Sequence, residues 1–202
     1  MVSNLIFSIL LYFRTRNIYQ CSFHQKFNSS TISNGRAVFY YQVVQGTAKM
    51  NNYTADGQEI IQGLFKTGES FGEPAILGDF TFPANAQAVE DLLLICLEKN
   101  RLMQLLTDHV EVSLNLLSIL SNRLRFKAIL AREMKGYEAE HRIMTLLQYL
   151  KKKAGQKERF LVDITRQTIA NLTGLRVETV IRAIKSLEEK GTVQIEHRKL
   201  YL

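Results

Sequence analysis

Several residue types that build covalently linked or metal-linked folds are scarce in this sequence. Its 202 residues include 2 cysteines and no tryptophan. Cys21 and Cys96 lie far apart along the chain, which argues against a disulfide framework. Two thiolates also cannot supply the four that iron–sulfur clusters usually need, so we expect no such cluster. Reduced cysteines are typical of the cytoplasm, which is the location that we predict.

Long apolar runs are missing as well. No apolar stretch approaches the roughly 20 residues that a membrane-spanning helix needs. The nearest, Leu5–Phe13, has no basic segment before it and is followed by Arg14 and Arg16 instead of a small-residue cleavage site. We therefore predict no membrane association. We interpret Leu5–Phe13 as a buried segment or an irregular N-terminus, with export as the minor alternative.

Positive charge is concentrated in the C-terminal third of the chain. The formal net charge is +7. Residues Gly136–Leu202 hold 13 Lys and Arg against 8 Asp and Glu, whereas Met1–Lys135 hold 13 against 11. Such an excess in one part of a chain is the pattern of a module that binds phosphate groups.

The stretch Ala37–Leu97 predicts a β-roll, because short strand patterns recur about every ten residues between turn signals. Ala55-Asp56-Gly57 is a hairpin turn signal. Leu92–Leu97 is a continuous apolar run, which is typical of a strand buried on both faces. Residues Met1–Gly35 match no pattern, and we assign no function to them. The other predicted strands are Val38–Tyr41, Gln42–Val44, Lys49–Tyr53 and Glu59–Leu64.

Residues Arg101–Lys135 form a long helical pattern with two apolar faces, which Thr107-Asp108 could interrupt. One face repeats in alternating steps of four and three residues, as in a coiled-coil seam. A helix that is apolar on two sides needs two partners, here the roll and a second subunit; a helix buried within one domain is the alternative. The second face consists of Leu116, Ile119, Leu120 and Leu130. The proposed dimer seam consists of Val110, Leu114, Leu117, Ser121, Leu124, Ala128 and Ala131.

Residues Ile164–Gly191 contain two amphipathic helical patterns separated by the turn Thr173-Gly174-Leu175. Thr165 is placed to cap the first helix, and Gly191 to end the second. Gly174 suits a sharp reversal, because glycine adopts positive φ without steric cost. The apolar residues expected to hold the second helix down are Val177, Val180, Ile181, Ile184 and Leu187.

Two helices in this arrangement form a helix-turn-helix, whose second helix can lie in the DNA major groove. Arg176, Glu178 and Arg182 stand among its apolar positions. Glu178 and Arg182 are four residues apart and share a face, so they can contact adjacent bases, Arg to guanine and Glu to the amino group of cytosine. The alternative is a helical hairpin whose charges merely face solvent.

The segments around this motif complete a DNA-binding module. Gly136-Tyr137 predicts a hinge, since glycine weakens a helical pattern. Glu140–Lys153 predicts a further helix, with a basic end at Lys151–Lys153 that is either solvated or in contact with phosphate. An alternating pattern on both sides of His197-Arg198 predicts a terminal hairpin, the wing.

The run Glu178-Thr179-Val180 followed by Arg182 resembles the winged helix-turn-helix of the Crp/Fnr family of bacterial transcription regulators, and the resemblance extends from Tyr40 to the C-terminus. It implies that Glu178 and Arg182 contact base edges and that Arg166 contacts phosphate. The cyclic AMP receptor branch has Arg where Val177 stands, and the Fnr branch has Val, which leaves the outer base of the half-site open. The expected DNA-binding residues are Thr165, Arg166, Gln167, Arg176, Val177, Glu178, Thr179, Arg182 and Lys185.

Gly68–Glu73, with the sequence GESFGE, resembles the phosphate-binding cassette of cyclic-nucleotide-binding domains. In that cassette, backbone amides face the phosphate and the Glu accepts a hydrogen bond from the ribose. The resemblance implies an effector site at Gly72 and Glu73. Alternatively, both residues only form a turn of the roll.

The rest of the cassette departs from the cyclic AMP receptor branch. An Arg-Ser pair follows there, whereas Pro83 and Ala84 stand here, and Lys127-Ala128 replaces a Thr-Ser pair on the dimer helix. A buried phosphate without a cation loses a charge-assisted contact. We therefore expect cyclic AMP to bind weakly or not at all. Lys127 could supply a substitute cation, or it could stay solvated or face DNA.

Patterns and resemblance together predict an α+β fold in three parts. Residues 1–107 form a β-roll of the jelly-roll type, of which 1–35 stay unassigned; residues 108–136 form a dimerisation helix and hinge; residues 137–202 form the winged helix-turn-helix. We expect a sequence-specific transcription regulator that binds palindromic double-stranded DNA as a homodimer, with RNA polymerase as a further partner.

Two other functions compete with this prediction. One is a sensor of a cyclic nucleotide or another small ligand, whose DNA binding depends on that effector. The other is an enzyme on a cupin-like roll, which would need several converging His or carboxylate ligands. We reject the enzyme and expect no catalytic or metal site, because no nucleophile–base pair is visible and the histidines are scattered. They are His24, His109, His141 and His197.

Overall fold

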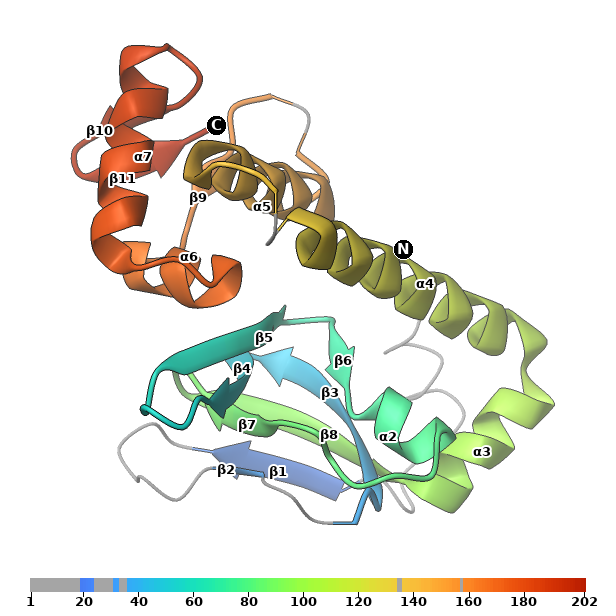
Figure 1. Ribbon diagram of the computed structural model, residues 1–202. Coiled ribbons are helices and arrows are strands. Elements are labelled where there is room, and N and C mark those ends of the chain that lie inside the picture. Colours follow the sequence, from blue (N-terminus) through green and yellow to red (C-terminus); the bar gives the residue numbers. More distant parts are fainter. Residues whose placement is uncertain (1–18, 24–30, 33–35, 134–135, 157) are drawn as a thin grey trace. The chain divides into compact units, whose positions relative to one another are not determined.

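Figure 1 shows the computed structural model of the chain, which describes residues 19–23, 31–32, 36–133, 136–156 and 158–202. The predicted segment Leu5–Phe13 lies outside these residues. The chain divides into two compact units, Met1–Ile119 and Leu120–Leu202. Strands dominate the first unit and helices the second, so the α+β prediction is confirmed.

The first unit is the predicted roll, built from two antiparallel four-stranded sheets. One sheet has the order β1 (Tyr19–Phe23), β8 (Leu92–Glu98), β3 (Phe39–Gln45), β6 (Ser70–Phe71). The other has the order β2 (Thr31–Ile32), β7 (Asn85–Ala88), β4 (Thr47–Tyr53), β5 (Glu59–Lys66). The two patterns predicted within Val38–Val44 form one continuous strand, β3. The predicted turn Ala55-Asp56-Gly57 joins β4 to β5, where Gly57 has a φ of +81°.

Gly46 is the point at which the chain passes from the first sheet to the second. It follows the last residue of β3 and precedes the first residue of β4. Its φ is +88°, and a Cβ atom there would lie 2.3 Å from the carbonyl oxygen of Asp91. Any other residue would therefore be both strained and in collision with the backbone.

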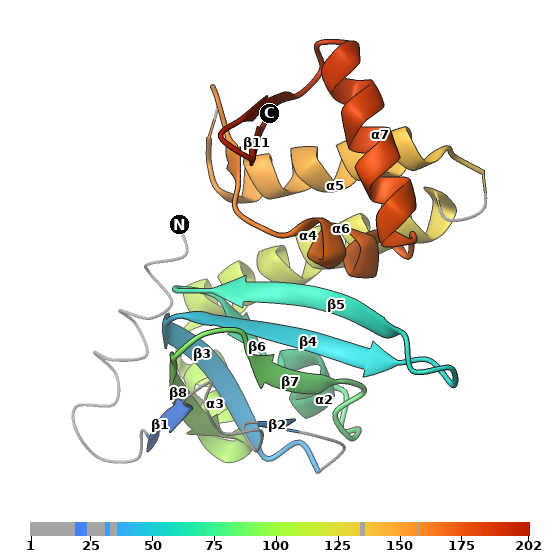
Figure 2. The ribbon, with the colours of Figure 1, turned by 90° about the vertical axis from the view of Figure 1, so that its left-hand side faces the viewer.

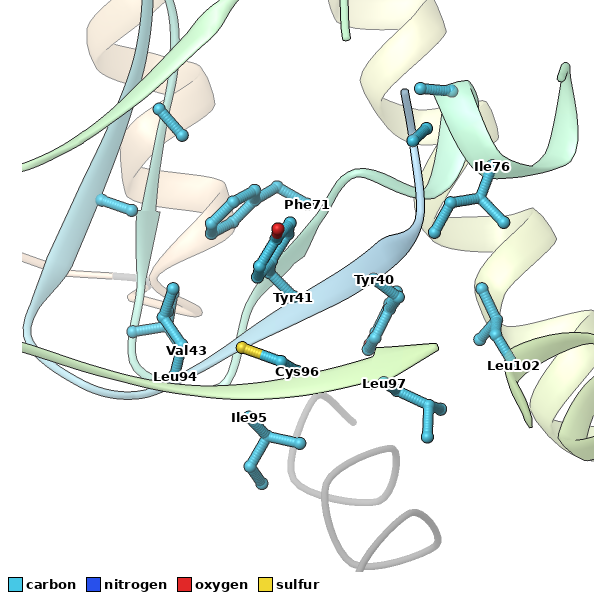
Figure 3. Close-up of a cluster of buried hydrophobic side chains, with 14 of the residues drawn as sticks. Tyr40, Tyr41, Val43, Phe71, Ile76, Leu94, Ile95, Cys96, Leu97 and Leu102 are labelled. Carbon is cyan, nitrogen blue, oxygen red and sulfur yellow. The ribbon is translucent and has the colours of Figure 1, made fainter. Parts of the chain in front are cut away.

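The core of the roll forms on both faces of β8, as its apolar run predicts. Tyr40 pairs with Leu97 and Tyr41 with Cys96 across β3 and β8. Figure 3 shows Tyr41 beside Phe71 on one side of these strands and Tyr40 and Leu97 on the other. The helix α3 (Lys99–Asp108) covers the second side with its buried side chains Leu102 and Leu105.

The predicted long helix consists of α3 and α4 (Val110–Glu133), which are separated at His109. His109 has extended backbone angles, φ −129° and ψ 90°, so the interruption falls next to the expected Thr107-Asp108. The 24-residue α4 continues from the first unit into the second. None of the helices in the described residues combines the length and apolarity that crossing a bilayer would require.

The second unit contains α5 (Ala139–Lys153), α6 (Arg166–Thr173) and α7 (Val177–Glu189), and α7 runs across α5 (Figure 2). Phe126 of α4 stacks on Tyr149 of α5 with ring centroids 3.5 Å apart. A small sheet follows the helices, in the order β10 (Gln194–Glu196), β11 (Lys199–Tyr201), β9 (Leu161–Val162). The core of this unit contains Ile143, Leu146, Leu147, Ile169, Val180, Ile184 and Leu187.

Candidate nucleic-acid interface

The turn between α6 and α7 has the geometry that the sequence predicts. The Thr165 hydroxyl accepts a hydrogen bond from the Thr168 amide at 3.0 Å and so caps α6. Gly174 adopts φ +65°, and the next amide, that of Leu175, donates to the carbonyl of Ala170 at 3.1 Å. The Thr173 hydroxyl donates to the carbonyl of Ile169 at 2.7 Å. These bonds satisfy some of the backbone groups that are left without partners at the two ends of the short helix.

The end of α7 is fixed by Gly191, as expected. Gly191 has φ +70° and its amide donates to the Glu188 carbonyl at 2.9 Å. The Thr192 amide donates to the Leu187 carbonyl at 2.9 Å. This pair of bonds is the Schellman motif, which terminates a helix at a glycine. The position of α7 is therefore set by local chemistry at its end as well as by its buried face.

Two opposite faces of α7 differ in chemistry. Val180, Ala183, Ile184 and Leu187 are buried in the core of the second unit. Glu178, Ile181, Arg182 and Lys185 are exposed. Each set follows the same helical spacing, offset by two residues, which places the sets on roughly opposite sides of the helix.

The prediction that Ile181 holds α7 down is wrong. Its side chain is 53% exposed, whereas the preceding Val180 is fully buried. Successive residues of a helix are separated by about 100°, and Ile181 lies on the side of Val180 away from Ala183, outside the buried stripe. Val180 has the position that continues through Ile184 and Leu187, and Ile181 joins the charged face.

The charged side chains of this face have no fixed partners in the part of the chain that the structure describes. Among the described residues, Arg176, Glu178, Arg182 and Lys185 form no side-chain hydrogen bond or ion pair. Other charges nearby are paired, as in Lys190 with Glu140 at 2.6 Å and Arg159 with Glu196 at 2.5 Å. The tips of the predicted base-contacting residues are thus available to a partner.

The start of α6 carries the predicted phosphate-binding residues. Arg166 is half-buried, and burial lowers the pKa of its guanidinium while the carboxylate of Glu188 opposes that change. Arginine stays cationic under these conditions. The side-chain amide of Gln167 donates to the side-chain oxygen of Asn171 at 2.8 Å, which orients it along α6. Backbone amides at a helix N-terminus favour anions, so a phosphate fits this end of α6.

The wing is present as a hairpin of β10 and β11. His197 and Arg198 occupy its two-residue turn with φ values of +48° and +66°. Both residues in the left-handed region are the mark of a type I′ turn. The sequence does not predict β9, which extends this sheet through the pairs Leu200–Val162 and Tyr201–Leu161. Two residues are too few to show an alternating pattern.

The cassette forms in the first unit at the start of α2 (Glu73–Leu77). Gly72 has φ +93°, and a Cβ atom on it would lie 3.2 Å from the carbonyl oxygen of Phe39. Glu73 is fully buried, and its carboxylate accepts a hydrogen bond from the Ser70 hydroxyl. Both candidate residues are therefore held tightly, in a turn that only glycine adopts without strain.

Aromatic rings pack close to Gly72. Tyr41 stacks on Phe71 at 5.1 Å and lies 6.2 Å from Phe82, measured between ring centroids. Tyr41 and Phe82 both lie within 3.4 Å of the position that a Gly72 Cβ would occupy. Apolar rings therefore take up space beside the cassette.

Pro83 and Ala84, which stand where the cyclic AMP receptor branch has an Arg-Ser pair, provide no cation. Pro83 is exposed, and its carbonyl accepts a hydrogen bond from the Asn52 side chain at 3.1 Å, while Ala84 is buried. Lys127, the other candidate, lies on α4 in the second unit. The effector candidates are thus divided between the two units.

The predicted dimer seam lies on the exposed side of α4. Leu124 is 70% exposed and Val110 is 64% exposed, and Leu114 and Leu117 are similar. Ala128 and Ala131 are also exposed. On the other face of the helix, Leu116 is buried, and Ile119, Leu120 and Leu130 are half-buried. Among the described residues, one apolar face of α4 is covered and the other is exposed.

Two models of known domain families match the chain, one within each unit. Residues 33–109 match the model of the cyclic nucleotide-binding domain, and residues 141–202 match that of the Crp-like helix-turn-helix domain. The cyclic AMP receptor protein of Thermus thermophilus is 32% identical over 171 residues, which are 80% of this chain and 77% of that protein. The transcriptional activator protein Anr of Pseudomonas aeruginosa is 25% identical over 166 residues, 80% of this chain and 68% of Anr.

A solved structure shows the same fold. FixK2 from Bradyrhizobium japonicum superposes with a TM-score of 0.74 at 22% identity, covering 92% of both chains.

Proposed function

The chain belongs to the Crp/Fnr family of transcription regulators, and we propose that it binds a two-fold symmetric DNA site as a homodimer. The observation that carries this proposal is the face of α7 formed by Glu178, Arg182 and Lys185. These side chains are exposed, lie opposite the buried stripe and have no internal partners among the described residues. In this role α7 lies in the major groove, where Arg182 contacts guanine and Glu178 contacts the amino group of cytosine.

The backbone of the DNA would be contacted from the elements beside α7. Arg166, Gln167 and the capped start of α6 suit one phosphate, and Arg176 suits another. Half to two-thirds of protein–DNA hydrogen bonds go to phosphate and sugar, and such contacts set orientation without selecting a sequence. Thr179 and Val177 are half-buried at the start of α7, where they support the helix and border the groove.

The uncovered face of α4 suits a second copy of the chain. A contiguous apolar stripe is costly for a monomer to expose, and an alternating spacing of four and three residues is that of paired helices. Two copies joined along α4 would present two recognition helices. We expect the bound DNA to have one half-site for each helix, about 10 bp apart centre to centre.

Selection of bound sequences from a random DNA pool tests the proposal. We expect a palindrome with a G·C pair at a fixed place in each half-site, and an affinity that falls steeply as salt rises, because bound counterions are released from DNA. Light scattering at micromolar concentration should give the mass of a dimer. Enrichment of no sequence, or a monomeric mass, would contradict the proposal.

Cyclic AMP is not the effector in this proposal, although the Thermus relative is named as its receptor. Pro83 and Ala84 provide neither a cation nor a hydroxyl, and aromatic rings pack beside Gly72. A charge-assisted contact to a buried phosphate contributes about 1.5–3 kcal/mol, so its loss lowers affinity roughly 10- to 150-fold. Calorimetric titration with cyclic AMP checks this; a micromolar or tighter dissociation constant would refute it.

A ligand-dependent regulator is the second candidate, and the buried carboxylate of Glu73 favours it. A fully buried carboxylate is costly to maintain for a purely structural purpose. A different small molecule with hydroxyl groups could use Glu73 as an acceptor. Thermal unfolding of the chain with a panel of hydroxylated metabolites would find such a ligand by a raised unfolding midpoint.

RNA polymerase is the protein partner that we propose for the DNA-bound dimer in the cytoplasm.

A further inference from the structure

Ile181 is the apolar side chain that α7 leaves uncovered. It is 53% exposed, and every other exposed residue of α7 is charged. A single exposed apolar residue is ordinary on a protein surface. The place of Ile181 within α7 therefore carries the argument, rather than its exposure alone.

Ile181 stands in the middle of the face proposed to enter the major groove. It follows Glu178 by three residues, directly precedes Arg182 and precedes Lys185 by four. Positions separated by three and four residues are neighbours on a helix surface. A helix that brings Glu178 and Arg182 to base edges therefore brings Ile181 to them as well.

The major groove offers one apolar group to such a side chain. Thymine carries a C5 methyl there, whereas cytosine, guanine and adenine present donors and acceptors. Contact between an isoleucine and this methyl removes apolar surface of both from water. Contact with the amino group of cytosine would instead leave a donor without a partner.

Isoleucine is suited to this contact by its shape. A β-branched side chain in a helix has one strongly preferred χ1 rotamer, so its methyl groups are held in a fixed place before DNA arrives. The buried residues Val180, Ala183 and Ile184 fix the helix beneath it. Little conformational freedom is left to lose on binding.

We infer that Ile181 contacts a thymine methyl in each half-site, next to the base pair that Arg182 contacts, and so selects thymine there. The inference rests on the proposed function. Deoxyuridine provides the test, because it differs from thymidine only by the missing methyl and keeps its base pairing. Each thymine of the selected site is replaced in turn, and duplex affinity is measured by fluorescence anisotropy.

We expect one thymine per half-site to respond, with affinity lowered about fourfold, the value for one buried group of methylene size. The Ile181→Ala variant should bind the thymine duplex and the deoxyuridine duplex equally, because it lacks the side chain that contacts the thymine methyl. In Arg182→Ala the thymine–uracil difference should persist while the preference at G·C is lost. Thermal unfolding should be unchanged in Ile181→Ala, since the side chain is exposed.

The outcomes separate this inference from the proposal beneath it. A selected site in which every uracil replacement is neutral overturns the thymine contact alone, as does a half-site without thymine. A difference that persists unchanged in Ile181→Ala assigns the methyl to another residue and also overturns it. Failure to select any duplex overturns the proposed function together with the inference.

Discussion

The exposed stripes of α4 and α7 have similar helical spacing but opposite chemistry. On α4 the stripe consists of leucine, valine and alanine with one serine, and on α7 it is charged with one isoleucine. In both helices the opposite face is buried in the chain's own core or half-buried. One face of each helix thus specifies the fold, and the other specifies the partner.

The difference between the stripes indicates different partners. Apolar side chains are stabilised when any apolar surface covers them, so the α4 stripe suits another protein surface. Its association should depend little on salt. Exposed charged side chains bind an oppositely charged surface that also forms hydrogen bonds, and their contribution to the affinity falls as salt rises. The four predictions that follow separate these two roles, from the largest effect to the smallest.

Leu124→Asp should have the largest effect. Leu124 is 70% exposed in the chain, so the substitution leaves the monomer folded, but it places a charge in the proposed apolar seam. We expect a monomer by light scattering and a loss of DNA affinity of about 10²- to 10⁴-fold, because two linked half-site contacts become independent. Leu124→Met keeps the apolar surface and should remain dimeric. A dimeric Leu124→Asp would place the interface elsewhere.

Arg182→Ala should have the next largest effect, confined to DNA. We expect a loss of about 1–3 kcal/mol at the cognate site and a relaxed preference at one G·C pair, with the dimer intact. Arg182→Lys keeps the charge but lacks the planar fork, so it should recover affinity without the guanine preference. Competition between cognate and mutated duplexes measures this. An unchanged base preference in Arg182→Ala would show that α7 is not used in this way.

Arg166→Ala should weaken binding to all sequences alike. Its guanidinium lies at the start of α6, and a phosphate contact carries no sequence information. We expect the slope of log affinity against log salt to decrease by about one per subunit, with the selected sequence unchanged. Arg166→Lys should restore most of the slope. A changed base preference would instead assign Arg166 to a base edge.

Sequence alone predicts the helix-turn-helix well because its signals are local. The cap at Thr165 and the positive φ of Gly174 and Gly191 each depend on a few neighbouring residues. Apolar periodicity does not distinguish the centre of a buried stripe from its margin, and this is why the pattern places Ile181 on the wrong face. Its position directly after Val180 was the available signal.

The roll is less predictable because its short strands depend on distant partners. The long strands β3, β4, β5 and β8 follow their apolar patterns, whereas β6 and β7 have two and four residues. Ser70–Phe71 becomes a strand only by pairing with Tyr41 and Gln42. Likewise β1 and β2 fall in the stretch 1–35 that shows no pattern, and they form by pairing with β8 and β7.

The domain boundaries and the roles of the individual site residues stay predictions. The fold shows where these residues lie, but their roles depend on contacts with DNA or a ligand. Glu73 illustrates the limit of local sequence signals. The motif predicts a glycine turn before a short helix. The burial of the carboxylate and the packing around Gly72 depend on residues that are distant in the sequence, such as Phe39 and Phe82.

Thr165→Ala should have the smallest effect and separates the scaffold from the contacting residues. The hydroxyl accepts the Thr168 amide at 3.0 Å, and loss of such a cap costs about 0.5–2 kcal/mol of stability. We expect the free energy of unfolding of the second unit to fall by this amount in chemical denaturation, while the base preference and the dimer mass stay unchanged. Thr165→Ser keeps the hydroxyl and should unfold like the parent chain. Arg182→Ala should alter base preference at constant stability, whereas Thr165→Ala should lower stability at constant base preference. A Thr165→Ala variant of unchanged stability but altered base preference would mean that Thr165 contacts a base rather than holding α6.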